Sequence, residues 1–199
     1  VQVNSEIGRL NAVLLHRPGV EIERMTPQNA SKALYSDILN KSIVDKEYNR
    51  FATVLSKWTK TYFVVDLLEE ILKNDTVKTS LVEQSCKLDG CEFLIDELLS
   101  HSPSQLAQEL IEGFAYRQGI DPDKYSEDRY ILRPLYNLFF TRDASSSIYN
   151  RVLIHNMATD VREREILIFK EIFTNYFGCE TLSTRGYAMD ARTEGGDVL

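Results

Sequence analysis

Two separate stretches of the chain follow the same order: a short apolar run, a helical pattern and a second short apolar run. In the first stretch, Asn11 to His16 (NAVLLH) precede a turn at Pro18 and Gly19, and Tyr62 to Val65 (YFVV) follow a helical pattern that begins at Ser42. Short apolar runs bounded by turn residues are typical of buried strands, and strands that alternate with helices are typical of α/β proteins. The sequence therefore predicts an α/β fold. The apolar residues of the helical pattern fall on one helical face, namely Ile43, Val44, Phe51, Val54, Leu55 and Trp58.

The second stretch repeats this order with Arg151 to His155 (RVLIH), a helix from Asp160 to about Phe177, and Cys179 to Leu182. Asp160 with Glu163 resembles a capping box at the start of the helix, and Gly178 is expected to end it. Two copies suggest an internal repeat. The similarity is one of pattern and not of matched residues, and any α/β protein alternates such elements.

Between the two stretches, from about Leu67 to Asp128, apolar residues keep helical spacing and no convincing strand is predicted. Ser102, Pro103 and Gln105 have the order of an N-cap, a first-turn proline and a capping-box partner. Gly119 to Ser126 is expected to form a loop that returns to the main body. We therefore divide the chain into residues 1–66, a helical insertion at 67–128, and residues 129–199.

The charge and the apolar content restrict the classes of partner. The net charge is -7, from 30 acidic and 23 basic residues, which disfavours a nucleic-acid partner and is compatible with a small cationic ligand. No window approaches the roughly 18 consecutive apolar residues of a membrane span, and no signal segment opens the chain. We expect a cytoplasmic protein without membrane contact. Its three cysteines, Cys86, Cys91 and Cys179, form no CxxC pair and predict reduced thiols without a metal site.

Two polar segments carry candidate chemistry: Asn137 to Asp143 (NLFFTRD) and Thr193 to Asp197 (TEGGD). A guanidinium group presents paired N–H donors in one plane, so carboxylates such as those of Asp143 and Glu194 can bind it bidentately. Each acid also has a plainer explanation. Asp143 could be a turn residue paired with Arg142, and Glu194 could be a solvated acid before a glycine turn. Local pattern alone favours these plainer alternatives.

Both segments, together with Thr26-Pro27-x-Asn29, resemble the PNxxFTRD and EGGD signatures of the arginine deiminase family across essentially the whole chain. The resemblance implies a five-fold pseudosymmetric α/β propeller with a helical insertion, of which this chain would hold the first module, the second and the start of a third. It also implies hydrolysis of L-arginine to L-citrulline and ammonia, without a cofactor or metal, by a homo-oligomer when full length.

The same resemblance assigns roles to individual residues. Asp143 and Glu194 would bind the substrate guanidinium as catalytic carboxylates, and Phe140 would pack against the substrate. Asn137 and Arg162 would hold its amino-acid end. Arg164 is the rival for the last role, because Asn156 meets Met157 directly here, one residue short of the family pattern. The other charges between residues 162 and 165 are expected to form a solvated face with local ion pairs.

The resemblance also implies a cysteine nucleophile and a histidine that moves protons. None of the three cysteines and none of His16, His101 and His155 lies in a segment that matches the family's cysteine or histidine motif. We therefore expect both groups beyond Leu199. Val198 and Leu199 are expected to open a further strand, which indicates a truncated chain. Alternatives are another guanidino-modifying enzyme, such as an agmatine deiminase or an amidinotransferase, and a non-catalytic arginine-binding module.

Overall fold

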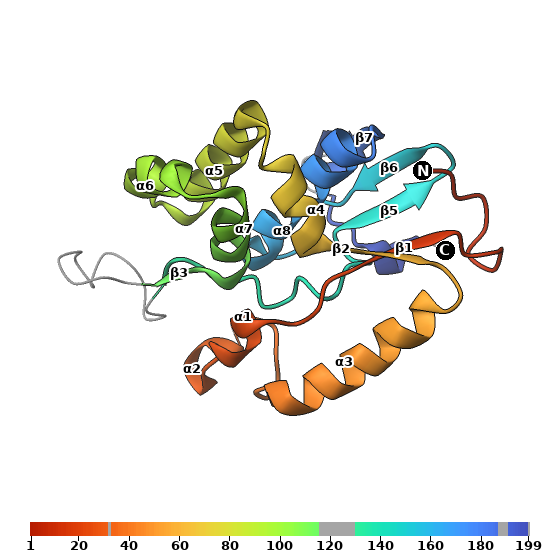
Figure 1. Cartoon of the computed structure of the whole chain (residues 1–199), viewed down its shortest axis with the longest axis horizontal. Helices are drawn as coiled ribbons and strands as arrows, with labels where there is room; N and C mark the ends of the chain where they lie inside the picture. The colour runs from red at the N-terminus through yellow and green to blue at the C-terminus, as the bar shows by residue number, and fades with distance from the viewer. Residues whose placement is uncertain (32, 116–129, 187–190, 199) are drawn as a thin grey trace.

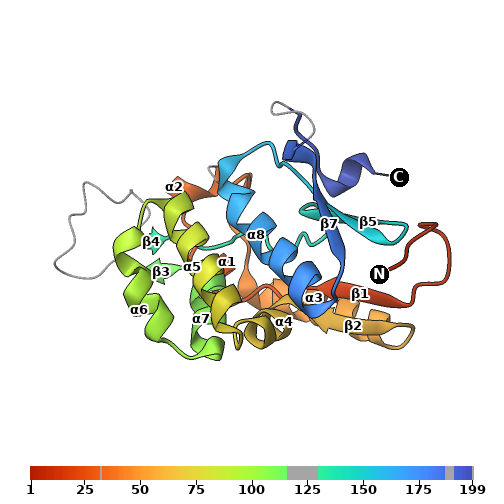
Figure 2. The same cartoon turned by 90° about the horizontal axis from the view of Figure 1, so that it is seen from above.

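The computed structural model describes residues 1–31, 33–115, 130–186 and 191–198. The strands of the two predicted α/β units lie at one end of the molecule, and α5, α6 and the short strand β3 lie at the other, with α4 and α8 between them (Figures 1 and 2). The loop predicted at Gly119 to Ser126 and the strand residue Leu199 lie outside the described residues. No helix within the described part is both long and apolar enough to cross a membrane.

The first predicted unit forms a parallel pair of strands. Strand β1 (Ala12–Leu15) pairs with β2 (Lys60–Phe63), and helix α3 (Lys41–Ser56) connects them. Two short helices, α1 (Val20–Glu23) and α2 (Pro27–Ala30), lie between β1 and α3. The second strand is therefore earlier than predicted. Residues 64 and 65 instead open helix α4 (Val64–Ile71), because Val64 is buried on the same helical face as Leu67, Leu68 and Ile71.

Helix α3 forms where a helix was predicted, but its apolar face is largely exposed. Asn40 caps it, since the Asn40 side chain accepts a hydrogen bond from the backbone of Ser42 at 3.0 Å. Four apolar side chains of α3 and the turn after it are exposed: Ile43 by 53%, Phe51 by 49%, Val54 by 55% and Trp58 by 82%. Only Ala52 of this helix is buried. Figure 1 shows α3 at the margin of the molecule, on the side away from the insertion.

The insertion is helical as predicted, with one short strand that the sequence did not indicate. Its helices are α4, α5 (Asp75–Asp89), η1 (Glu92–Leu94), α6 (Ile95–Ser100) and α7 (Pro103–Glu112). Ser102 caps α7 through a bond from the Gln105 backbone N–H at 3.3 Å, whereas the Gln105 side chain donates to Glu109 and completes no capping box. Strand β3 (Phe114–Ala115) then pairs antiparallel with β4 (Tyr130–Leu132). The sequence predicts no strand at β3 or β4, because strands of two and three residues show no readable alternation.

The second predicted unit forms a three-stranded sheet. A hairpin of β5 (Ser145–Ile148) and β6 (Arg151–Ile154) is followed by a helix and by β7 (Glu180–Ser183), which lies parallel to β6. The helix starts as a 3-10 turn, η2 (Asp160–Arg162), continues as α8 (Glu163–Glu171) and ends as a π turn, η3 (Ile172–Tyr176). The predicted capping box of Asp160 and Glu163 does not form, because Glu163 pairs with Arg185 instead. Gly178, at φ 62°, ends the helix as predicted.

One hydrophobic core joins the insertion to the second unit. It includes Leu68 of α4, Leu81 of α5, Leu110 of α7 and Phe169 of α8, each at most 1% exposed. The sheets of the described residues hold two, two and three strands. These small sheets do not test the five-fold propeller or the domain boundaries at 66 and 128, so both stay predictions.

Candidate functional site

The two segments that sequence analysis singled out lie against each other. The backbone N–H of Gly195 donates to the carbonyl of Asp143 at 3.1 Å. Arg142 joins the same segments, since its Nε donates to the carbonyl of Gly195 at 3.2 Å and its Nη2 to that of Val198 at 3.0 Å. Nη2 also reaches the carboxylate of Glu6 at 2.7 Å. Arg142 therefore links the segments, and the alternative in which it pairs with Asp143 is wrong.

Gly195 allows this close approach. A Cβ atom at this position would lie 1.9 Å from the carbonyl oxygen of Arg142, closer than any real contact. Glu194 precedes it at the start of a 3-10 turn, η5 (Gly195–Asp197), and is exposed. Its carboxylate accepts from the backbone of Asp197, and the Asp197 carboxylate accepts from the backbone of Glu194 at 2.9 Å. The turn thus fixes the main chain beside Glu194.

Arg162 lies between two carboxylates. Its Nη1 donates to Oδ2 of Asp143 at 2.6 Å, while its Nε and Nη2 donate to Oε2 of Glu165 at 2.9 and 2.8 Å. The side chains of Arg162 and Glu165 are 6% and 1% exposed, whereas that of Asp143 is 26% exposed. Asp143 is the accessible end of this triad and Glu165 is the buried end.

Burial and the neighbouring charges shift the protonation of the triad in opposite directions. Burial raises the pKa of Glu165 to about 7, against the opposing effect of Arg162. Burial would lower the pKa of Arg162, but Glu165 and Asp143 outweigh it and raise that pKa. Arg162 therefore remains charged, whereas Glu165 can gain a proton near neutral pH.

The segment before α3 covers the other side of this triad. Asn137 is buried, and its Nδ2 donates to the carbonyl of Ala33 at 2.9 Å, while its own carbonyl accepts from Arg162 at 3.3 Å. The hydroxyl of Tyr35 donates to the carbonyl of Tyr136 at 3.0 Å. Burial, with Glu165 as the next cause, raises the pKa of that hydroxyl. The Asn137 amide is thus engaged with the protein itself.

Phe140, the proposed packing partner of the substrate, is 44% exposed. Its ring lies 4.2 Å from that of Phe139, measured between centroids. It follows Asn137 in the turn that leads to Asp143, and its carbonyl lies 3.4 Å from Nη2 of Arg162. Phe140 therefore stands beside the triad with an accessible ring.

His155 contacts both the Asp143 segment and the Glu194 segment. Its backbone N–H donates to Ala144 at 3.1 Å, and its ring nitrogens lie 2.9 Å from the hydroxyl of Ser146 and 3.0 Å from that of Thr193. Burial lowers the pKa of His155, although Asp197 and Asp143 oppose this effect. His155 therefore binds Ala144, which follows Asp143, through its backbone, and Thr193, which precedes Glu194, through its ring.

Arg164, the rival of Arg162, points away from the site. Its Nη1 contacts the carboxylate of Asp89 at 3.1 Å, and its Nη2 donates to the carbonyl of Leu110. Arg133 binds the same Asp89 carboxylate at 2.7 Å. Arg162, Arg164 and Glu165 are 5%, 2% and 1% exposed, so the prediction of a solvated face is wrong. The two arginines have partners on other segments, Asp143 for Arg162 and Asp89 for Arg164, whereas Glu165 pairs with Arg162 on its own helical segment.

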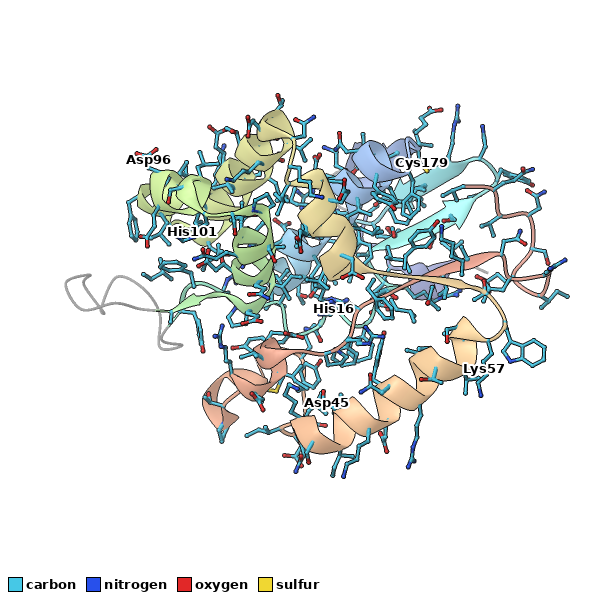
Figure 3. All side chains as sticks on the ribbon, viewed as in Figure 1. His16, Asp45, Lys57, Asp96, His101 and Cys179 are labelled. Carbon is cyan, nitrogen blue, oxygen red and sulfur yellow. The ribbon has the colours of Figure 1, made fainter. Side chains whose placement is uncertain are left out.

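The cysteines lie apart from the triad. Cys86 and Cys91 are buried next to each other at the end of α5, as predicted for small core residues, and Cys179 precedes β7 (Figure 3). The thiol of Cys179 lies 3.7 Å from the carbonyl of Phe177. Within residues 1–31, 33–115, 130–186 and 191–198, no group of three or more histidine, cysteine and acidic side chains is placed to hold a metal ion.

Sequence reasoning assigned no role at this site to Glu165, which belongs to the triad, or to His155 and Tyr35, which lie around it. A spacing of three residues between Arg162 and Glu165 on a predicted helix was the available signal for that pair. His155 was noticed only as the residue that closes a strand. No local signal indicated Tyr35, because it reaches the triad through the fold.

The described part of the chain is thus an α/β protein in which a buried arginine joins an accessible carboxylate to a buried one, beside a glycine turn that carries a further acid. A family model described as arginine deiminase matches residues 31–199. The chain belongs to the arginine deiminase family.

Curated relatives agree with this assignment. An arginine deiminase of Limosilactobacillus fermentum is 30% identical over 100% of this chain and 53% of the relative. One of Oenococcus oeni is 31% identical over 100% of this chain and 52% of the relative. One of Borreliella burgdorferi is 31% identical over 87% of this chain and 46% of the relative. The chain spans about half the length of the curated relatives it matches.

Proposed function

We propose that the full-length protein is an arginine deiminase, which hydrolyses L-arginine to L-citrulline and ammonia through a cysteine-linked intermediate. The observation that carries this proposal is the direct contact between the Asp143 segment and the Glu194 turn, in a chain of this family. A guanidinium is the ligand that suits two such carboxylates, because each can accept a pair of its N–H groups.

In this proposal the chain supplies the binding half of the chemistry. Asp143 and Glu194 bind the substrate guanidinium, and Phe140 packs against the substrate with its exposed ring. Arg162 and Asn137 serve the amino-acid end of the substrate indirectly, since the Asn137 amide is bonded to Ala33 and the Arg162 guanidinium to carboxylates. Both would have to exchange these partners to touch the substrate directly.

The nucleophile is proposed to come from outside these 199 residues. Cys86 and Cys91 are buried among the insertion helices, and Cys179 lies beside Phe177, so none of these thiols is placed to attack a carbon held by Asp143. By itself, the chain is therefore proposed to be inactive. We also infer a five-fold α/β propeller with the insertion at 67–128, a cytoplasmic location and a homo-oligomer, with neither nucleic acid nor membrane as a partner.

The test is citrulline release by the purified full-length protein. Wild-type protein is expected to convert L-arginine to citrulline, and the Asp143→Asn variant is expected to lose most of that activity. Agmatine serves as the control substrate, because it has the guanidinium but lacks the carboxylate of the amino-acid end. A wild-type protein that converts agmatine and not arginine would reject the proposed substrate, and one that binds arginine without turnover would favour a binding module.

A further inference from the structure

Arg162 has two carboxylate partners that differ in accessibility. Glu165 receives two of its N–H groups, from Nε and Nη2, and is 1% exposed. Asp143 receives one, from Nη1 to Oδ2, and is 26% exposed. The buried partner therefore holds Arg162 more completely, and the accessible partner is the one that an incoming ligand can reach.

The charges in this triad do not balance. One guanidinium faces two carboxylates, so an ionised triad has a net charge of one negative unit, which an incoming guanidinium would neutralise. For Asp143 to bind that ligand, Arg162 must not depend on Asp143 as its sole counter-ion. Glu165 meets this requirement, because it is already bonded to Arg162 through two N–H groups.

We propose that Glu165 is a positioning residue that retains and neutralises Arg162, so that Asp143 is available to bind the substrate guanidinium. This inference rests on the proposed function, because it takes the guanidinium of arginine as the ligand of Asp143. Without the Glu165 charge, Arg162 turns to Asp143 as its only carboxylate partner and competes with the substrate for it. The first consequence is weaker substrate binding and not a slower chemical step.

The surroundings of Glu165 make ligand binding depend on pH. The groups that face it are Arg162 and Arg164 from its own helical segment, Asp143 from the turn before β5, and Tyr35 from the segment before α3. Burial raises the pKa of Glu165 to about 7. Its Oε1 atom is buried without a hydrogen-bond partner among the described residues. A bound guanidinium favours the ionised form, so ligand binding weakens as the pH falls below about 7.

The experiment compares full-length wild-type protein with Glu165→Gln, Glu165→Asp and the control Glu171→Gln, which lies on the same helix. The Glu171 carboxylate accepts from Asn175 and takes no part in the triad. Citrulline release gives kcat and KM for L-arginine between pH 6 and pH 8. Stabilisation against thermal unfolding by methylguanidine measures guanidinium binding independently of turnover.

For Glu165→Gln at pH 8 we expect KM to rise by about 10- to 100-fold with little change in kcat, because a buried charge loses its counter-ion. The rise in wild-type KM between pH 8 and pH 6 should be absent from this variant. Glu165→Asp should recover part of the affinity, and Glu171→Gln should resemble the wild type.

A merely structural role for Glu165 would lower the melting temperature of Glu165→Gln and leave its KM and its pH profile unchanged, which would overturn the proposal. If that variant does not fold, wild-type methylguanidine binding of equal strength at pH 8 and pH 6 would overturn it as well. Failure of the proposed function appears separately, as wild-type protein that binds methylguanidine with this pH dependence but releases no citrulline.

Discussion

Replacement of Gly195 by alanine tests whether the contact between the two site segments is required. The added Cβ would lie 1.9 Å from the carbonyl oxygen and 2.7 Å from the carbonyl carbon of Arg142, and both are backbone atoms that cannot rotate away. The turn must therefore move by roughly 1.5 Å to reach an ordinary contact distance, which begins at 3.4 Å. That movement breaks or lengthens the 3.1 Å bond from Gly195 to Asp143.

The expected cost has two components. Overpacking costs about 1–3 kcal/mol of unfolding free energy, and the lost backbone hydrogen bond adds about 1 kcal/mol. A displacement of about 1 Å at a substrate-binding carboxylate lowers activity by about 100-fold. Urea unfolding of the full-length protein measures the first effect, and citrulline release from arginine measures the second.

Gly196→Ala is the matched control for this prediction. A Cβ at Gly196 meets only the Glu194 carboxylate oxygen, at 3.8 Å, which is ordinary van der Waals contact. The two variants add the same methyl group to neighbouring residues of one turn. Equal unfolding free energies and equal activities for Gly195→Ala and Gly196→Ala would refute the argument that the close approach to Arg142 matters.

The other predictions concern the carboxylates, the insertion and the exposed helix. Asp143→Asn and Glu194→Gln should each cost several kcal/mol, on the order of 2–4, of transition-state stabilisation in the full-length protein, and the double variant should cost less than their sum, as measured by kcat/KM. The 199-residue chain alone should release no citrulline, and thiol-sensitive turnover by it would contradict the assignment of its cysteines. Burial raises the pKa of Asp89, but its two arginine partners outweigh this effect and lower it, so its contribution to stability is present above about pH 4 and is lost as the pH falls further. Asp89→Asn should therefore cost about 3–5 kcal/mol at pH 7 and flatten the acid unfolding curve. The exposed apolar side chains of α3 and of the turn after it are expected to make the 199-residue chain self-associate. Trp58→Glu, at an 82% exposed position in that turn, should reduce this self-association in light scattering without lowering stability, and unchanged scattering would exclude Trp58 as a cause.

The sequence predicted strands β1, β2, β6 and β7 and the long helices, but not β3, β4 or β5 and not the environment of the side chains. Residues 11–16 and 151–155 were recognisable as strands because their apolar runs end at turn or polar residues, and β1 and β6 lie within them. The exposure of Phe51 and Trp58 could not be predicted, because periodicity identifies an apolar face but not what covers it.

The sequence identified the two segments that form the site, but not which side chains pair with one another there. The acids of FTRD and EGGD were found by resemblance, and the contact between Asp143 and Gly195 is consistent with that reading. The burial of Arg162 with Glu165 was not foreseen, since a charged helical turn has the same sequence pattern whether it faces solvent or a second carboxylate. Which of these occurs depends on residues such as Asp143 that approach only after folding.

The contact between Gly195 and Arg142 has a consequence for any attempt to redesign ligand selectivity. The atoms in that contact are main chain, so the closest approach of the Asp143 and Glu194 segments is set by backbone atoms. A larger or smaller cation cannot be accommodated by repacking neighbours, because no rotamer change alters a backbone separation. Selectivity must therefore be changed through the length of the carboxylate side chains themselves. Under the proposed function, in which Glu194 binds the substrate guanidinium, Glu194→Asp withdraws the acid by one methylene group from an unmoved main chain and should favour a bulkier guanidino compound.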